Sequence, residues 1–511
     1  MVNCETEPLT HRLSEIAKQA NYDVVIIGSG PAGTAIAEYV CMKHAGLRIC
    51  ILERGPILTT THVNNVLREK PGLPTFGASK VSRRTQFITA FEKHPWLKDF
   101  AKDPEGLPGA MGGMMIYALG GRGIVAGAHL RRFYEEDFDL WSDGRWPFRT
   151  SELEKYYELA ERVRNVSYGE CAGLSQFTAL ARLASLRAAE PPWGVDVCSG
   201  RNADISRGFD SSAARLWDLL VGDHIESTLS RDGGKSCSRR LFLSTETCAT
   251  KLLPTNPGVT VECKNRYGQS GEIHGKVVVL AASPVESARL VLLSDLGSLQ
   301  TRPVGRYLAE HMFVRAEAIM KVDWSDPQDR YVNVVVPPPP GHDLAGRYQI
   351  HIIGEPDDNN PNQVRLRLTG EAAMDPQKVN CVFLDTRETD EFGMLRASIS
   401  LQYSSADNLR LHHMKESIGK VVQQLRGRLE TESELLGKGR SHHEAGTLRM
   451  GLGHRGETVT DEHGEVYGVN DLFVADGSVF PCVGVANPML TVTAWAYRVA
   501  DQVIGKLAAS F

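Results

Sequence analysis

Apolar residues follow two different spacings along the chain. Apolar runs occur at 24–27, at 47–52 (with Arg48 as its one polar residue) and at 277–282, which is continuous, and a helical-looking stretch at 32–44 separates the first two. Continuous runs of this length are typical of strands buried on both faces of a parallel sheet. Alternating apolar and polar residues, typical of half-buried antiparallel strands, occur instead at 314–319, 348–353, 364–368 and 395–401. Helical patterns occur at 150–167, 284–294 and 408–431.

These two spacings predict two domains. A chain of 511 residues exceeds the roughly 250–300 residues at which a single core stops growing. We expect an α/β fold (α+β overall), with a Rossmann-like domain assembled from separated segments and a second domain built on a mostly antiparallel sheet. The segments assigned to the first domain are 21–56, 110–130, 235–312 and 440–511. Those assigned to the second domain and its excursions are 57–109, 131–234 and 313–439.

A glycine-rich turn lies between the first apolar run and the first helical stretch. It reads Gly28-Ser29-Gly30-Pro31-Ala32-Gly33, and Glu53 ends the second apolar run, twenty positions after the third glycine. The first two glycines let the backbone approach a pyrophosphate, the third lets helix and strand pack closely, and the helix N-terminus offers N–H groups to phosphate. Glu53 would accept hydrogen bonds from an adenosine ribose. The unit predicts binding of an adenine dinucleotide and leaves open which one.

Two polar clusters near the C-terminus supply the candidate catalytic residues. The first, 441–451, contains His443 shortly before Gly446-Thr447, and the second, 470–494, contains Asn487. A histidine with a pKa near 6.5 is neutral near pH 7 and can take the proton of an alcohol. An asparagine can hydrogen-bond the substrate oxygen without titrating. Taken alone, each has a plainer interpretation: His443 as a structural histidine, and Asn487 as the N-cap of a helix that begins at Pro488.

Composition and charge argue against several other classes of protein. The net charge of −5 gives no sign of a nucleic-acid surface, and no apolar run approaches the roughly 20 residues that span a bilayer. The N-terminal segment lacks the apolar centre of a signal peptide, and the ten cysteines include no C-x-x-C pair. We therefore expect a cytoplasmic protein without a membrane segment. Adjacent histidines, as in His412-His413 and His442-His443, point in different directions, so we expect no metal site.

Taken together, these pieces resemble the glucose-methanol-choline (GMC) family of flavin oxidoreductases over nearly the whole length. The resemblance rests on the N-terminal unit with Glu53, the glycine-rich segment 119–128, the buried strand 277–282, His443 with Gly446-Thr447, and 476–478 with 486–488. It implies that the dinucleotide is FAD and that His443 and Asn487 are the catalytic pair. It places Glu53 at the adenosine ribose, Asp476 near the ribityl chain and pyrophosphate, 120–128 along the isoalloxazine, and 259–261 near the adenine. The FAD contacts it implies are Gly28, Gly30, Pro31, Ala32, Gly33, Glu53, Arg54, Gly120, Gly121, Val125, Ala126, Gly127, Val261, Ala281, Asp476, Gly477, Asn487, Pro488 and Met489.

The resemblance also implies a reaction. The chain length and Asn487 look most like the members that oxidise pyranoses, glycosides and the amino-sugar units of aminoglycosides. We therefore expect oxidation of an alcohol on a carbohydrate to a carbonyl, by hydride transfer to flavin N5 with His443 as the base. An FAD-containing lyase of the same fold, a GMC enzyme for a non-sugar alcohol and a nicotinamide enzyme stay open as alternatives. The electron acceptor (oxygen or another molecule) and the oligomeric state are also left open.

One departure from the family concerns how the flavin is attached. Pyranose oxidases with covalent flavin carry a histidine in the glycine-rich segment, at the position of Val125 here. Segment 120–128 contains no His or Cys, and the nearest histidine is His129. We therefore expect FAD to be bound noncovalently.

Overall fold

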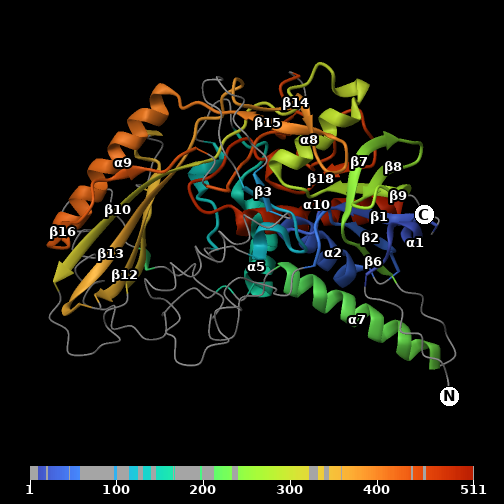
Figure 1. Cartoon of the computed structure of the whole chain (residues 1–511), viewed down its shortest axis with the longest axis horizontal. Helices are drawn as coiled ribbons and strands as arrows, with labels where there is room; N and C mark the ends of the chain where they lie inside the picture. The colour runs from blue at the N-terminus through green and yellow to red at the C-terminus, as the bar shows by residue number, and fades with distance from the viewer. Residues whose placement is uncertain are drawn as a thin grey trace.

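A computed structural model shows the fold of the chain (Figure 1). The residues it describes are 10–18, 21–44, 46–57, 97–99, 114–124, 130–139, 145–164, 166, 196–197, 212–232, 240–321, 332–338, 344–357, 359–438, 441–452 and 456–509. Two sheets dominate the described part, and each has seven strands. None of the helices in these ranges is long and apolar enough to cross a membrane.

The first sheet is parallel at its centre. Strand β1 (Tyr22–Ile27) pairs with β2 (Ile49–Leu52) on one side and with β9 (Ser270–Leu280) on the other, and all three are rich in fully buried Val, Ile and Leu. Strands β6 (Leu241–Ser244) and β18 (Leu472–Val474) extend the parallel pairing beyond β2 and β9. An antiparallel pair, β7 (Thr247–Pro254) and β8 (Val259–Asn265), continues from the other part of β9. The three apolar runs are therefore neighbouring strands, as their composition predicted.

Helices flank this sheet. Helix α2 (Pro31–Lys43) follows β1, and it packs against the C-terminal helix α10 (Met489–Ala509) and α7 (Ser212–Asp232). Helix α5 (Glu154–Val163) packs on α10, and α8 (Pro284–Ser294) packs against β7. The segments that form this domain are thus far apart in sequence, with β18 and α10 returning to the sheet after the second domain is complete (Figure 1).

The second sheet is antiparallel and forms the other end of the molecule (Figure 1). Its main order is β16 (Gly427–Leu429), β10 (His311–Lys321), β13 (Asn360–Ala373), β12 (Tyr348–Asp357), β11 (Val332–Val336) and β5 (Asp196–Val197), and β17 (Glu434–Leu435) also pairs with β10. Helix α9 (Ser405–Gln424) covers one face, where Met414 and Ile418 lie against Gly370. The opposite face carries His311, Phe313 and Arg315 at alternate positions of β10.

One predicted strand lies in a different sheet from the one expected. Residues 395–401 were expected to join the second domain's sheet, but β15 (Leu395–Ser400) pairs only with β14 (Cys381–Thr389) among the described strands. This hairpin packs on α8 of the first domain. Alternation in the sequence correctly indicates that one face is buried, but it does not identify the element that buries it. The remaining short elements are α1 (Leu13–Ile16), β3 (Leu97–Asp99), β4 (Met114–Ile116) and single 3₁₀ turns.

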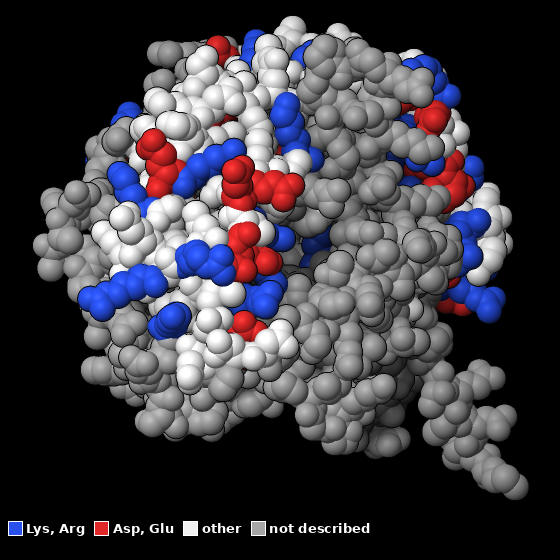
Figure 2. Space-filling view, turned by 60° about the vertical axis from the view of Figure 1, so that its left-hand side comes forward, with Lys and Arg blue, Asp and Glu red and all other residues white. Residues whose placement is uncertain are grey.

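Charges of both signs are interspersed over the described part of the face in Figure 2. Lys and Arg side chains lie beside Asp and Glu side chains across this face, in keeping with a net charge of only −5. A surface of this kind lacks the single-sign field that attracts a polyanion.

The first and third glycines of the N-terminal turn are held by close backbone contacts. Gly28 has a φ of +102°, and a side chain there would meet the Ala281 carbonyl oxygen at 2.5 Å. A Cβ on Gly33 would lie 1.9 Å from the Gly28 carbonyl oxygen. Gly30 differs, because a Cβ there would have no atom within 4 Å. The third glycine is therefore needed for packing, as the spacing predicted.

Replacement of Gly33 by Ala should destabilise the protein, whereas the same replacement at Gly30 should not. The Gly33→Ala methyl group overlaps backbone that cannot move away freely, so we expect a loss of about 1–3 kcal/mol in the free energy of unfolding. Gly30 has a φ of −65°, which alanine adopts without strain. Thermal denaturation of the two variants without added ligand compares them directly. Equal melting temperatures would contradict this account of the turn.

Candidate active site

A cavity of about 540 Å³ lies at the carboxyl ends of β1, β2, β9 and β18. Ligands of open α/β sheets bind at this edge. At one end the cavity is lined by the 28–32 turn, Glu53 and Arg54. At the other end it is lined by 441–444 and 487–489, together with Phe313 and Arg315 from the second domain's sheet. One elongated space therefore joins the predicted nucleotide site to the predicted catalytic pair.

Glu53 lies beside the glycine turn with its carboxylate already held in place. One oxygen accepts hydrogen bonds from the Ser29 amide (3.2 Å) and the Ser29 hydroxyl (2.5 Å), and the other accepts one from the Gly55 amide (2.7 Å). Burial raises the pKa of Glu53, while these hydrogen bonds oppose the rise. The side chain is thus fixed at the wall of the cavity, where it can accept hydrogen bonds from a ribose.

Asp476 occupies the equivalent place at the end of β18. Its carboxylate accepts hydrogen bonds from the Ser283 amide (2.9 Å), the Ser287 hydroxyl (2.5 Å) and the Ser478 amide (2.9 Å). Burial raises the pKa of Asp476, and the hydrogen bonds from these serines lower it. The residue also caps the 3₁₀ turn Gly477–Val479, which brings Gly477 to the cavity wall.

Two arginines offer unpaired donors to the cavity. Arg122 uses its terminal nitrogens to bind the Glu444 carboxylate and the His442 carbonyl oxygen (2.9 Å), and its Nε–H has no partner in the described part of the chain. The Nε–H of Arg54 is likewise buried without a described partner. A buried donor without an acceptor is costly, so each is satisfied best by a ligand rich in acceptor atoms. An FAD molecule has such acceptors along its length, and α2 directs its N-terminus at the same space.

The segment that carries His443 is held in place by backbone hydrogen bonds to Ala309 and Gly305. Ala445 exchanges hydrogen bonds with Ala309 (2.8 and 3.1 Å), and the Gly305 amide donates to the Thr447 carbonyl (2.8 Å). The Thr447 hydroxyl donates to the Pro284 carbonyl (2.6 Å). Gly446 has a φ of +92°, and a Cβ there would meet the Tyr307 carbonyl oxygen at 2.2 Å. Gly446 and Thr447 thus fix the position of the segment that carries His443.

His443 and Asn487 lie together at the far end of the cavity and share a neighbour, Glu371. The Asn487 amide donates to Glu371 Oε1 (3.2 Å), and His443 Nδ1 lies 3.4 Å from the same oxygen. Burial lowers the pKa of His443 from its ordinary value near 6.5, and the Glu371 carboxylate opposes the change. A histidine in this environment is neutral near pH 7, as a proton acceptor must be. Helix α10 begins at Met489, two residues after Asn487. The side-chain amide of Asn487 belongs to the polar group around Glu371.

Glu371 and His311 complete this polar group, and neither was predicted from the sequence as a site residue. Glu371 also accepts hydrogen bonds from Gln349 Nε2 (2.7 Å) and lies 2.8 Å from His311 Nδ1. Burial alone would raise the pKa of Glu371, but the neighbouring His311 and His443 side chains lower it well below its usual range. The carboxylate is therefore ionised, buried and surrounded by donors.

His311 has one ring nitrogen whose role is fixed by its partner. Its Nε2 hydrogen-bonds to the Gly484 carbonyl oxygen, which can only accept, so Nε2 carries a proton. Its Nδ1 lies 2.8 Å from His443 Nδ1 as well as from Glu371. The donor atoms of His311, Glu371 and His443 lie within 4.8 Å of one another, a spacing that a metal ion could also use. Direct hydrogen bonding accounts for that spacing without one.

The signal that could have revealed these residues is the register of the second sheet. Phe313 on β10 faces Glu371 on β13, and Glu371 faces Gln349 on β12. Each polar residue occupies a position where alternation alone predicts a solvated side chain. Only the pairing of the strands shows that this polar face is turned toward the cavity.

Most of the residues predicted to contact the cofactor line the cavity, and the others differ for identifiable reasons. Gly33 and Gly120 lie behind the wall, where Gly33 packs against Gly28 and Gly120 against Ala213 of α7. Val261 is fully buried in β8, and the neighbouring strand β7 lines the cavity instead, through Thr247, Cys248 and Ala249. Val125, Ala126 and Gly127 lie outside the described residues. The predicted residues that do line the cavity are Gly28, Gly30, Pro31, Ala32, Glu53, Arg54, Gly121, Ala281, His443, Asp476, Gly477, Asn487, Pro488 and Met489.

Known proteins resemble this chain over nearly its full length. It is 26% identical to 6'''-hydroxyparomomycin C oxidase of Streptomyces lividus, with 96% of this chain and 92% of the relative covered. It is also 26% identical to paromamine 6'-oxidase of Streptomyces fradiae (95% and 92% covered) and 24% identical to C-glycoside 3-oxidase of Microbacterium trichothecenolyticum (96% and 98% covered).

Solved structures confirm the fold. Pyridoxine 4-oxidase from Mesorbium loti superposes with a TM-score of 0.62 at 16% identity, covering 94% of this chain and 99% of the other. A formate oxidase superposes with a TM-score of 0.64 at 13% identity, covering 96% of this chain and 99% of the other.

Family models match two parts of the chain. Residues 23–76, which include the glycine turn, match the lycopene cyclase protein model. Residues 365–496, which include Glu371, His443 and Asn487, match the GMC oxidoreductase model. The C-terminal part of the chain therefore carries a GMC oxidoreductase domain, and the full-length similarity to sugar and glycoside oxidases agrees with this match.

Proposed function

We propose that this protein is an FAD-dependent oxidoreductase that converts an alcohol group of a sugar, glycoside or amino-sugar to a carbonyl. The observation that carries the proposal is the polar group of His443, Asn487, Glu371 and His311 at one end of a cavity whose other end holds Glu53. The match of residues 365–496 to the GMC oxidoreductase model supports FAD as the cofactor. When bound, FAD supplies the acceptor for the hydride that leaves the alcohol carbon.

His443 is assigned as the base in this reaction. Oxidation of an alcohol requires loss of the hydroxyl proton, and the Nε2 atom of a neutral His443 can accept it. Its Nδ1 atom lies toward His311 and Glu371, which fix the ring, and the Glu371 carboxylate stabilises the positive charge that forms on it. Asn487, whose amide is anchored on Glu371, lies beside the base and can hydrogen-bond the substrate oxygen. The residues thus hold one hydroxyl group in a fixed orientation.

A carbohydrate substrate suits the lining of this end of the cavity. Phe313 presents an aromatic ring, 5.9 Å from the His443 ring between centroids, and Arg315 presents a cation farther along the same strand face. Sugars offer both a C–H face that packs on aromatic rings and hydroxyl groups that accept from charged donors. The names of three of the full-length relatives describe oxidation of paromamine, a hydroxyparomomycin and C-glycosides, which supports the same class.

A screen for flavin bleaching tests the proposal. Sugars, glycosides and aminoglycosides are added without oxygen to the purified holoprotein, and the visible absorbance of the flavin is followed. The right substrate should bleach it, and colour should return with oxygen or with an artificial acceptor, whichever the enzyme uses. Substrate turnover without bleaching would identify a lyase. A colourless protein that reduces NAD would overturn the FAD assignment.

Noncovalent attachment of FAD is part of the proposal. Gly121, Arg122 and Gly123, the described members of the glycine-rich segment that line the cavity, offer no histidine or cysteine for a covalent bond. Precipitation with acid should therefore release the yellow colour into the supernatant, as an absorbance scan of both fractions will show. A yellow pellet after washing would refute noncovalent binding.

Replacement of His443 by Ala should slow flavin reduction by about 10²–10⁴-fold, because the proton acceptor is lost. The protein should keep its FAD, as judged by the ratio of visible to protein absorbance. His442→Asn is the matched control, since His442 has a φ of +58° that asparagine tolerates, and it binds Arg122 through its backbone carbonyl. A large loss in the control with an active His443→Ala variant would move the base to His442.

The pH dependence of kcat/KM should show the ionisation of the base. At low pH, protonated His443 cannot accept a proton, so kcat/KM should rise with pH and level off. Because burial lowers the pKa of His443 below about 6.5, the inflection should lie below that pH. Glu371→Gln removes the carboxylate that opposes this shift, so its inflection should move to still lower pH. An inflection above pH 7 in the native enzyme would argue against this base.

A further inference from the structure

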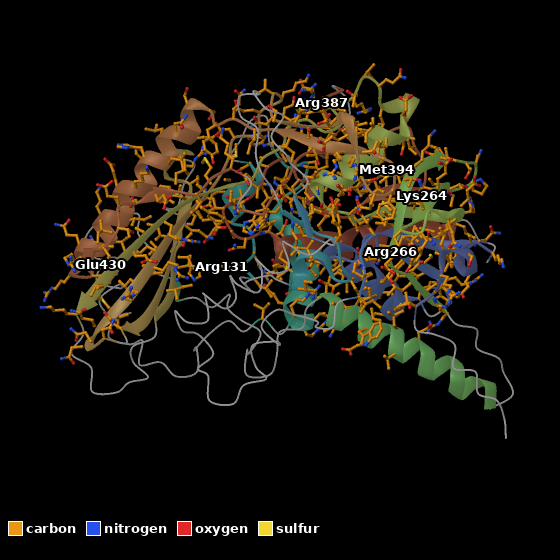
Figure 3. The ribbon with its side chains drawn as sticks, in the orientation of Figure 1. Arg131, Lys264, Arg266, Arg387, Met394 and Glu430 are labelled. Atoms are coloured by element: carbon orange, nitrogen blue, oxygen red, sulfur yellow. The ribbon has the colours of Figure 1, made fainter. Side chains whose placement is uncertain are left out.

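The hairpin of β14 and β15 leaves the second domain and ends at the nucleotide end of the cavity. Its tip, residues 390–394, contains Met394, which lines the cavity with Cys248 of β7 and Leu293 of α8. Lys264 of β8 donates to the Phe392 carbonyl (3.1 Å), which attaches the tip to the first domain's sheet. Figure 3 shows Met394 near Lys264, with Arg387 of the same hairpin farther out.

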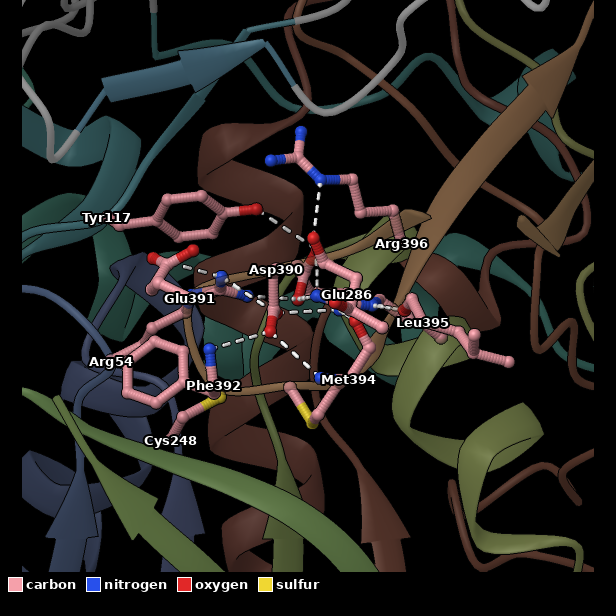
Figure 4. A network of polar contacts seen from close by, with 12 residues as sticks. Arg54, Tyr117, Cys248, Glu286, Asp390, Glu391, Phe392, Met394, Leu395 and Arg396 are labelled. Carbon is pink, nitrogen blue, oxygen red and sulfur yellow. Dashed lines mark hydrogen bonds and ion pairs between the residues drawn. The ribbon is translucent and has the colours of Figure 1, made fainter. Parts of the chain in front are cut away.

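Four charged side chains join this tip to the wall of the cavity (Figure 4). Arg54 binds Asp390 (3.0 Å) and Glu286 (3.3 Å), and Arg289 binds the same two carboxylates at 2.7 and 3.1 Å. Cations and anions thus alternate around a closed ring, and each side chain is at most 12% exposed. Loss of one member of such a buried group leaves the others uncompensated, which is strongly destabilising locally.

Asp390 links this ring to the shape of the tip. Its Oδ1 accepts hydrogen bonds from the Phe392 amide (2.9 Å) and the Met394 amide (3.0 Å), while Oδ2 faces Arg54 and Arg289. Burial would raise the pKa of Asp390, but the two arginines lower it, so the carboxylate is charged near neutral pH. The Asp390 side chain therefore stabilises the turn at the hairpin tip and also binds the tip to Arg54 and Arg289.

Arg54 is held from both sides but keeps one donor for a ligand. Its guanidinium lies over the rings of Tyr117 (4.2 Å) and Phe392 (5.0 Å), and its terminal nitrogens bind the carboxylates of the ring. Its Nε–H is buried without a partner in the described residues, and Arg54 lines the cavity directly after Glu53. Arg54 is therefore a fixed part of the cavity wall beside Glu53, the residue assigned to the adenosine ribose.

We infer that the hairpin tip, 390–394, is part of the cofactor site and slows release of FAD by fixing Arg54 and walling the adenosine end. The inference rests on the proposed FAD-dependent function. It assigns Asp390 and Met394, which approach from the second domain, to cofactor retention. The first domain's βαβ unit thus binds the adenosine from one side, and the hairpin closes the other.

The test compares two aspartates on the same hairpin. Asp390→Asn keeps the shape of the side chain and removes its charge from the ring. Asp385→Asn is the control, since Asp385 pairs with Arg387 on the exposed part of the hairpin, where the Arg387 side chain is 65% exposed. FAD is removed from each protein, and rebinding and release are followed by flavin fluorescence. Asp390→Asn should raise both the Kd and the release rate at least tenfold, whereas Asp385→Asn should stay within twofold of the wild type.

A fragment of the cofactor separates this role from general loss of structure. AMP carries only the adenosine end, so its Kd should rise in Asp390→Asn, while that of FMN, which lacks adenosine, should not. Met394→Ala, which leaves the ionic ring intact, should also speed FAD release. This second variant keeps the test valid if Asp390→Asn does not fold.

The outcomes distinguish the inference from the proposed function. Unchanged FAD release in folded Asp390→Asn or in Met394→Ala would overturn the inference and leave the proposed function standing. Equal weakening of AMP and FMN would also overturn it, because the effect would then be global. Failure of the wild-type apoprotein to bind FAD at all would overturn the proposed function itself.

Discussion

The buried carboxylate of Glu371 is the interaction on which the arrangement of the site depends. It lies on the second domain's sheet, yet it binds Asn487 and approaches His443, which both belong to the C-terminal part of the first domain. A buried charge is tolerated only when donors surround it, and here the side-chain amides of Gln349 and Asn487 donate to the carboxylate, while His311 Nδ1 lies 2.8 Å from it. The need to satisfy one carboxylate thus fixes the position of one domain against the other at the point where the chemistry takes place.

The order of the chain explains how both domains reach this point. The strand β10 starts at His311, directly after the backbone bridge between Ala309 and Ala445 that places the base. The chain then forms the antiparallel sheet, crosses to α8 with the β14–β15 hairpin, returns as α9, and comes back through His443 to β18 and α10. The backbone therefore passes between the two sheets several times, and His443, the proposed base, lies on one of these connecting segments.

Local patterns in the sequence were enough to predict the parts of the site that depend on local structure. Glu53, Asp476 and Asn487 each follow a buried strand or precede a helix, and the structure places all three at the cavity wall. Glu371 and His311 could not be predicted in the same way, because their importance arises from strand register and from a carbonyl, that of Gly484, 173 positions away. Val261 was predicted to contact the cofactor because its strand was recognised, but the neighbouring strand β7 lines the cavity instead. Residues 395–401 were likewise recognised as a strand, but their partner strand, β14, was not.

The second domain's sheet has a consequence for how this fold can change its substrate. His311 and Glu371 lie at one end of the polar face, next to His443, whereas Arg315 lies four residues after His311 on the same face of β10. The backbone hydrogen bonds of a long antiparallel pairing hold both ends, so substitutions at the far end need not move the near end. Under the proposed function, a substitution at Arg315 can therefore change how a substrate is bound while His311 and Glu371 keep their places beside His443.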